Sequence, residues 1–257
     1  MSTRPHTVLV VGATGSVGRF AVAEALRQGY ATRALVRNLD KAKTLPKGAF
    51  PVVGDLTDAS TLDRALAGAD AVIFTHGSNS TEEQAEAVDY GAVRAVLTAL
   101  GDRSARIALM TAIGITKRDS IYNKENHGRD WKRRGERLLR ASGLEYTIVR
   151  PAAFDYNADD AHKLVMRQGD HPANGGVARE QIARVLVNSL SNDAARHKTF
   201  ELLDEQGEAQ DDLTPLFAAL QTDEPAASDA PGDVENLPLS DEPQRVLDDL
   251  KRLTDYE

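Results

Sequence analysis

Short apolar segments alternate with longer amphipathic segments over the first 150 residues of the chain. The short segments are rich in valine, isoleucine and leucine, as expected of strands buried on both faces of a sheet. The longer segments carry apolar residues at spacings of three and four, which indicates helices packed against that sheet. We expect strands at 7–11, 31–36, 50–56, 71–74, 106–110 and 145–151, and helices after Gly18 and at 60–66, 82–100 and 126–142.

This alternation predicts an α/β fold with a doubly wound parallel sheet and helices on both of its faces. Ligands of such sheets bind outside the carboxyl ends of the strands, where the strand order reverses. The helix at 82–100 carries a stripe of small apolar residues that is either core or an interface between two copies, so a monomer and a homodimer both remain open. Beyond Pro151 we expect strands at 162–167 and 199–203 and helices at 179–190, 211–220 and 244–253.

A glycine-rich turn, GATGSVG, joins the first strand to the first helix. Glycine permits the tight bend, allows the backbone to approach a pyrophosphate and lets the helix pack against the strand. Hydroxyl groups in the turn and the unpaired N–H groups of the helix start add donors for an anion. Glycines that serve only the bend are the other interpretation, but the position after an N-terminal strand favours dinucleotide binding. The expected pyrophosphate-binding residues are Gly12, Thr14, Gly15, Ser16, Val17 and Gly18.

Arg37 ends the second predicted strand, where NAD-binding folds carry an acidic residue that accepts a hydrogen bond from the ribose 2′-hydroxyl. A guanidinium cannot accept that bond, but it can bind a 2′-phosphate with two donors. NADP(H) is therefore favoured over NAD(H). Arg33 is a second candidate, and an exposed arginine without a ligand is the other interpretation.

Three residues follow the fourth predicted strand, namely Thr75, His76 and Gly77. Their backbone is expected to lie against the ribose and nicotinamide side of the cofactor, because this loop also follows the carboxyl end of a central strand. We expect His76 to line the cleft rather than to act as a general base.

The GxxGxxG spacing resembles that of the short-chain dehydrogenase/reductase superfamily in its extended and atypical branches. Glu136, the run 138–140, the run 142–144 and the segment 146–151 (YTIVRP) are similar to the atypical subgroup with an NAD(P)H-binding or NmrA-like domain. The resemblance covers residues 5–204 and implies a Rossmann-type NAD(P)-binding domain over 1–204, whose part 151–204 covers the substrate. It implies adenine contacts at Asp55 and Leu56 and a cofactor contact at Pro151, although Asp55 could instead cap a turn.

The resemblance also implies where catalytic residues should lie. Complete relatives carry a tyrosine four residues before a lysine, which binds the nicotinamide ribose and lowers the tyrosine pKa. Lys132 occupies the lysine position here, but Gly128 stands where the tyrosine should be. Thr111 retains a hydroxyl at the usual serine position, and His127 and Tyr156 are other candidate proton donors.

These residues and the resemblance are compatible with two functions of different class. In the first, the protein is an NADP(H)-dependent oxidoreductase of a small carbonyl or quinone-like substrate, with Thr111, His127 or water handling the proton. In the second, it is a non-catalytic NADP(H) sensor that acts on a regulated protein partner, as NmrA-like relatives do. The helix and Lys132 favour the enzyme, whereas the missing tyrosine favours the sensor.

The composition of the chain argues against several kinds of binding site and partner. The chain has no cysteine, so thiolate sites are excluded, and its scattered histidines show no metal-ligand spacing. Residues 1–200 carry 28 basic and 22 acidic side chains, whereas residues 201–257 carry three basic and 17 acidic ones. This balance argues against nucleic acid as a partner.

Several expectations concern location and the C-terminal part. The first strand begins close to Met1, and no apolar run approaches the roughly 18 residues that span a bilayer, so we expect a cytoplasmic protein without membrane contact. The acidic C-terminal extension, 205–257, is expected to be a solvated surface with short helices. Its segment Thr222–Glu242 has the composition of a mobile linker.

Overall fold

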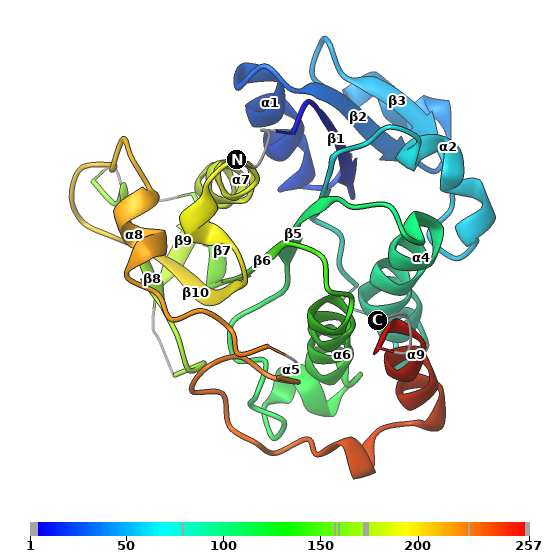
Figure 1. The fold of residues 1–257 in the computed structure, drawn as a ribbon. Coiled ribbons are helices and arrows are strands. Elements are labelled where there is room, and N and C mark those ends of the chain that lie inside the picture. The colour runs from blue at the N-terminus through cyan, green and yellow to red at the C-terminus, as the bar shows by residue number, and fades with distance from the viewer. Residues whose placement is uncertain are drawn as a thin grey trace.

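A computed structural model of the chain describes residues 5–78, 80–156, 158, 160–171, 175–225 and 227–254, with Tyr122 described by its backbone alone. An eight-stranded sheet crosses the centre in the order β3-β2-β1-β4-β5-β6-β10-β8 (Figure 1). Its strands are β1 (Thr7–Val11), β2 (Ala31–Val36), β3 (Phe50–Val53), β4 (Ala71–Phe74), β5 (Arg106–Met110), β6 (Tyr146–Pro151), β8 (Lys163–Arg167) and β10 (Lys198–Glu205). Only β8 runs antiparallel to its neighbour within this sheet, and the strand order reverses between β1 and β4.

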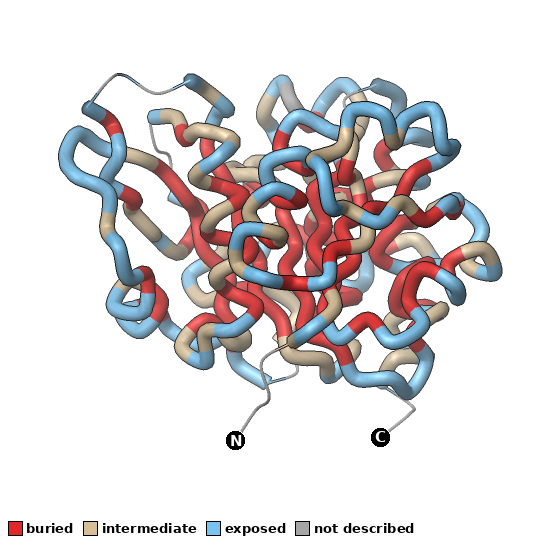
Figure 2. Tube along the Cα trace, turned by 90° about the horizontal axis from the view of Figure 1, so that it is seen from above, coloured by how far each residue is buried: buried red, intermediate tan, exposed pale blue. Residues whose placement is uncertain are grey.

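Helices cover both faces of this sheet. The helices are α1 (Gly18–Arg27), α2 (Asp63–Leu66), α3 (Glu82–Gln84), α4 (Gly91–Leu100), α5 (Ile121–Lys124), α6 (Gly128–Ala141), α7 (Arg179–Ser189), α8 (Thr214–Ala218) and α9 (Gln244–Thr254). Helices α1 and α7 lie on one face, and α4, α6 and α9 lie on the other (Figure 1). The strands form the buried centre, and exposed segments surround them (Figure 2). The predicted α/β fold with a doubly wound, mostly parallel sheet is confirmed.

Several elements differ from the prediction in their boundaries or were not predicted. The expected single helix over 82–100 is divided by a π-helical segment, Ala85–Tyr90, between α3 and α4. Strand β3 ends at Val53 rather than at residue 56, because the Asp55 carboxylate accepts hydrogen bonds from the backbone and hydroxyl of Thr57 and turns the chain. Two three-residue strands, β7 (Ala153–Asp155) and β9 (Gly176–Ala178), pair with each other and were not predicted.

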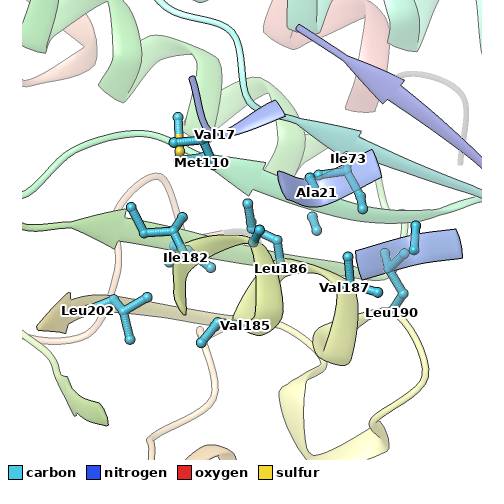
Figure 3. Packing of buried hydrophobic residues seen from close by; sticks show 14 of the residues in the cluster. Val17, Ala21, Ile73, Met110, Ile182, Val185, Leu186, Val187, Leu190 and Leu202 are labelled. Carbon is cyan, nitrogen blue, oxygen red and sulfur yellow. The ribbon is translucent and has the colours of Figure 1, made fainter. Parts of the chain in front are cut away.

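The face covered by α1 and α7 is an apolar contact. Ala21 on α1 and Ile182 and Leu186 on α7 are fully buried there, together with side chains from β1, β4 and β5 (Figure 3). The small alanine side chains let the two helices approach closely, because no long side chain separates them. This contact keeps the start of α1, where the glycine turn ends, fixed against the sheet.

The opposite face is crossed by the C-terminal strap, which we define as the described residues 222–225 and 227–242. Its carboxylates pair with a row of arginines on α6 and with Arg150 on β6. The pairs are Asp223–Arg140 at 3.2 Å, Asp229–Arg133 and Asp229–Arg137 at 2.8 Å, Asp233–Arg150 at 2.7 Å, and Glu242–Arg134 at 2.5 Å and Glu242–Arg137 at 2.6 Å. The expectation of a solvated acidic surface is wrong for these carboxylates, because the arginines bury and neutralise them. The described part of the expected linker is thus packed against α6.

None of the helices among the described residues combines the length and apolar character that a membrane crossing requires.

Candidate active site

The glycine turn forms a backbone cradle between β1 and α1. Gly12 has a φ of +81°, and a Cβ atom there would lie 2.7 Å from the backbone nitrogen of His76. At Gly18 a Cβ atom would lie 2.0 Å from the Gly12 carbonyl oxygen. Any side chain at these two positions would therefore push the loops after β1 and β4 apart. Helix α1 has no side-chain cap at its start, so an anion can bind at the N–H groups of its first turn other than that of Arg19, which donates to the Gly15 carbonyl at 3.2 Å.

The other residues of the cradle divide by exposure. Gly15 and Ser16 are exposed and Thr14 is half-buried, so Thr14 and Ser16 offer hydroxyl donors at the turn, whereas the Gly15 N–H donates to the Gly12 carbonyl at 2.8 Å. Val17 points the other way, and its side chain is buried in the core beneath α7 (Figure 3). Only the backbone of Val17 can therefore contribute to ligand binding.

The loop after β4 lies directly against this cradle. Thr75 donates a hydrogen bond from its hydroxyl to the Val11 carbonyl at 3.0 Å, which ties the two loops together. His76 is buried, and burial together with the Lys132 ammonium lowers its pKa to about 3. Its Nδ1 atom has no hydrogen-bond partner in the part of the chain that the structure describes. A neutral imidazole of this kind can accept a hydrogen bond, but it is no proton donor at neutral pH.

Lys132 reaches this loop from α6. Its ammonium forms an ion pair with Asp89, whose side chain is 1% exposed. A Cβ atom at Gly77 would lie 3.4 Å from the Lys132 ammonium, so the lysine stands beside the β4 loop, as a ribose contact requires. Ser78 donates its backbone N–H to the same carboxylate at 3.3 Å. Burial raises the pKa of Asp89, and the Lys132 ammonium opposes that shift.

Asp89 was missed by the sequence reasoning. It lies 43 residues before Lys132 and inside the π-helical segment, which widens the helix by one residue at that point. Helical spacing alone does not place an aspartate there against a lysine of another helix. A π-bulge inside an otherwise regular amphipathic helix has no sequence signature that could have revealed this contact.

Thr111 and Glu136 are brought together beneath the cleft. The Thr111 hydroxyl donates to a Glu136 oxygen at 2.7 Å, and both side chains are buried. Burial raises the pKa of Glu136, but Arg150 and Arg140 outweigh that effect and hold it below its ordinary value. Because an ionised carboxylate only accepts hydrogen bonds, the single proton of Thr111 is committed to Glu136. The Thr111 oxygen can still accept a bond, but it cannot supply a proton to a substrate.

The other candidate proton donors do not converge on Lys132. His127 precedes α6 with a φ of 50°, and its side chain is 49% exposed and lies 3.6 Å from Asp130. Gly128 is buried, and a Cβ atom there would lie 2.9 Å from the side-chain oxygen of Asn126. Tyr156 is 90% exposed on the loop after β6. The structure thus gathers the cradle, the β4 loop, Lys132 and Asp89, and neither His127 nor Tyr156 forms a hydrogen bond with Lys132 among the residues described.

The adenosine end of the expected site is formed by the ends of β2 and β3. Arg37 is exposed after β2, and its charge contributes to the lowered pKa of Asp55, after the larger effect of the two hydrogen bonds from Thr57. Asp55 therefore makes the turn-capping bonds that were its other interpretation. Leu56 packs against the core, and Pro151 is the buried last residue of β6. Arg33 donates instead to the carbonyls of Ala65 and Ala67, which engages its guanidinium within the protein.

Comparison with known proteins agrees with this geometry. A family model described as NAD(P)H-binding matches residues 12–193. Sanguinarine reductase from Eschscholzia californica is 27% identical in an alignment of 268 residues. The alignment covers 86% of this chain and 98% of that protein. The photosystem II assembly factor Ycf39 from Cyanophora paradoxa is 37% identical over 158 residues, 58% of this chain and 46% of the relative.

A solved structure shows the same fold. A putative NAD-dependent epimerase/dehydratase from Bacillus halodurans superposes with a TM-score of 0.73 at 24% identity, covering 84% of this chain and all of that one. At this identity the likeness concerns the fold alone. Since the neighbour is covered completely, part of this chain has no counterpart in it.

Proposed function

The chain belongs to the family of NAD(P)H-binding domains, and from that premise we propose that it is an NADP(H)-dependent reductase of a small carbonyl or quinone-like compound. The observation that carries the proposal is the position of Lys132 beside Gly77, on the edge of the sheet where the glycine cradle lies. A dinucleotide whose pyrophosphate rests on the cradle extends its nicotinamide half along this edge. The cofactor supplies the hydride, and the residues of the chain bind and orient it.

Each part of the cleft has a distinct role in this proposal. The backbone of Gly12–Gly18 and the start of α1 bind the pyrophosphate, and Arg37 binds the 2′-phosphate. Lys132, held by Asp89, donates to hydroxyls of the nicotinamide ribose, while Thr75 and Gly77 allow close approach of the backbone. Water is the proton source, because the Thr111 proton is committed to Glu136 and His76 is neutral.

Removal of the Lys132 ammonium tests the reductase directly. We expect wild-type protein to oxidise NADPH with quinones or aldehydes, and Lys132→Met to lower kcat/KM by roughly 10- to 150-fold through the loss of a charge-assisted bond. The assay follows NADPH absorbance over a panel of acceptors. Lys124→Met, an exposed lysine on α5, is the matched control and should leave the rate unchanged. Equal rates for Lys132→Met and wild type would contradict the role of Lys132.

The preference for NADP(H) rests on Arg37 and has its own test. Calorimetric titration should show tighter binding of NADPH than of NADH, and Arg37→Ala should reduce the difference by roughly 10- to 150-fold, as expected for one lost phosphate contact. Lys41→Ala removes another exposed cation after β2 and serves as the control. Equal affinities of the wild-type protein for the two nucleotides would refute the assignment.

A second function, an NADP(H) sensor acting on a protein partner, is favoured by Gly128 at the tyrosine position. The similarity to an assembly factor is compatible with it, since that relative is named for assembly rather than for a reaction. The same panel separates the two functions. Tight NADPH binding without oxidation by any acceptor would favour the sensor.

A further inference from the structure

Three side chains form an exposed group on the segments that follow β6 and β9. Phe154 on β7 is 39% exposed and Tyr156, in the following loop, is 90% exposed. The Arg179 guanidinium carbon lies 5.4 Å from the ring centroid of Phe154 and 5.1 Å from that of Tyr156. We call these three residues the aromatic platform. Arg179 lies over both rings, and the exposed parts of the rings remain accessible to a planar ligand.

Arg179 differs from the arginines under the C-terminal strap. Each strap-facing arginine pairs with a carboxylate, whereas no carboxylate pairs with Arg179 among the residues described. One guanidinium nitrogen of Arg179 donates to the Asp155 carbonyl at 3.3 Å, and no described residue accepts a hydrogen bond from its other donors. As the first residue of α7, Arg179 also lies at the positive end of a helix dipole. Among the described residues, the platform therefore offers a positive charge without a carboxylate partner beside two aromatic rings.

The topology places this platform at the carboxyl edge of the sheet. Phe154 comes three residues after Pro151, the last residue of β6, and Thr75 follows the parallel strand β4 at the same edge. Helix α7 packs along α1, and its Ile182, one turn after Arg179, belongs to the same buried apolar cluster as Val17 at the cradle end of α1. The start of α7 is thus at the end of the molecule where the cradle and the Lys132 cleft lie.

We propose that Phe154, Tyr156 and Arg179 select the substrate, and that the substrate class is planar aromatic acceptors with a carbonyl oxygen, the quinones. This inference rests on the proposed reductase function. The rings stack on the planar acceptor, and the guanidinium donates to its oxygen. A cation is useful at that oxygen because hydride transfer makes it negative.

The atoms and electrons of the reaction balance without a proton from a side chain of the protein. The C4–H bond of the reduced nicotinamide breaks, and its hydride, a proton with two electrons, is taken up by the quinone. The quinone is reduced to the hydroquinone monoanion while the nicotinamide is oxidised. Arg179 stabilises the anionic oxygen until water supplies the second proton. An isolated aliphatic carbonyl gives a far more basic alkoxide, so this arrangement discriminates against it.

The test compares menadione with an aliphatic aldehyde, butanal, as acceptors for wild-type protein and variants. Arg179→Gln should lower kcat/KM for menadione by roughly 10- to 100-fold, and Arg179→Lys, which keeps the charge without the planar fork, should fall between. Tyr156→Leu should lower it by roughly three- to tenfold. The matched controls are Arg64→Gln and Phe50→Leu, an exposed arginine and an exposed aromatic away from the platform, and both should behave as wild type.

Binding of NADPH, measured by calorimetry for each variant, distinguishes the possible failures. Unchanged NADPH affinity with a selective loss for menadione supports the platform. Unchanged menadione kinetics in Arg179→Gln and Tyr156→Leu overturn it while the reductase function stands. Weakened NADPH binding in Arg179→Gln also overturns it, because Arg179 would then serve the cofactor. If the wild type reduces butanal but not menadione, the quinone class is wrong, and if it reduces no acceptor, the proposed function itself fails.

Discussion

Helices α1 and α7 meet one face of the sheet through alanine, valine, isoleucine and leucine, whereas α6 on the other face combines apolar side chains with arginines paired with the C-terminal strap. Both faces are buried, but their stability depends on different interactions, namely apolar packing on the first and ion pairs on the second. An apolar contact loses stability in proportion to the groups removed. A buried ion pair is costly to form, and loss of one partner leaves an uncompensated charge in the interior. The ion pairs of the α6 face therefore depend on a segment about 80 to 100 residues away in sequence, whereas the apolar packing of the α1 face does not involve that segment.

The largest expected effect comes from Arg150 on the ionic face. Arg150 is 1% exposed at its side chain and pairs with both Glu136 and Asp233 at 2.7 Å. Arg150→Met would leave both carboxylates buried with fewer partners and should lower the free energy of unfolding by about 3–5 kcal/mol. Urea denaturation measures this change.

A surface pair provides the control for Arg150. Arg27, 68% exposed, pairs with Glu24 on α1, and Arg27→Met should cost only about 0–1 kcal/mol. Similar losses for the two substitutions would mean that the buried network contributes no more than a surface pair, and the contrast between the faces would disappear.

An intermediate effect is expected at Glu201, which also lies on the ionic face. Burial raises its pKa from an ordinary 4.5 to about 7, helped by Asp170 and Asp233 and opposed by Arg150 at 3.5 Å, and one of its oxygens has no partner among the described residues. The folded protein therefore retains a proton that the unfolded chain releases, so stability falls as pH rises from about 4.5 to about 7.

Glu201→Gln should remove that loss. The variant should be about 2–3 kcal/mol more stable than wild type at pH 8 and similar to it at pH 4. Urea denaturation of both proteins at the two pH values measures the difference. An equal difference at both values would show that Glu201 does not titrate between them.

The smallest effect is expected on the apolar face. Ile182 is fully buried between α7 and α1 (Figure 3), and Ile182→Val removes one methylene without a charge or a hydrogen bond. The expected loss is about 0.5–1.5 kcal/mol, independent of pH between 4 and 8. Denaturation at pH 4 and pH 8 tests this independence, and a pH-dependent loss would show that the two faces are coupled.

Sequence patterns located most of the strands because a buried strand is a local apolar run. The same holds for the glycine turn, since the need for glycine at positions 12 and 18 arises from backbone atoms only a few residues away or on the adjacent strand. The register of Lys132 on α6 follows from helical spacing. Local patterns are therefore enough to place the expected cofactor half of the site.

The amino-acid sequence by itself thus indicated the strands of the sheet, the glycine cradle and the position of Lys132 on α6. Each of these depends on residues that are neighbours in sequence or follow a regular period. Tertiary structure decided the rest: Asp89 on Lys132, Arg179 between Phe154 and Tyr156, and the C-terminal strap on α6. An acidic segment and an arginine-rich helix look alike in sequence whether solvated or buried, and only folding brings the opposite charges within bonding distance. The physical reason is that the energy of a charge depends on its partners and its exposure, neither of which is a property of its own segment.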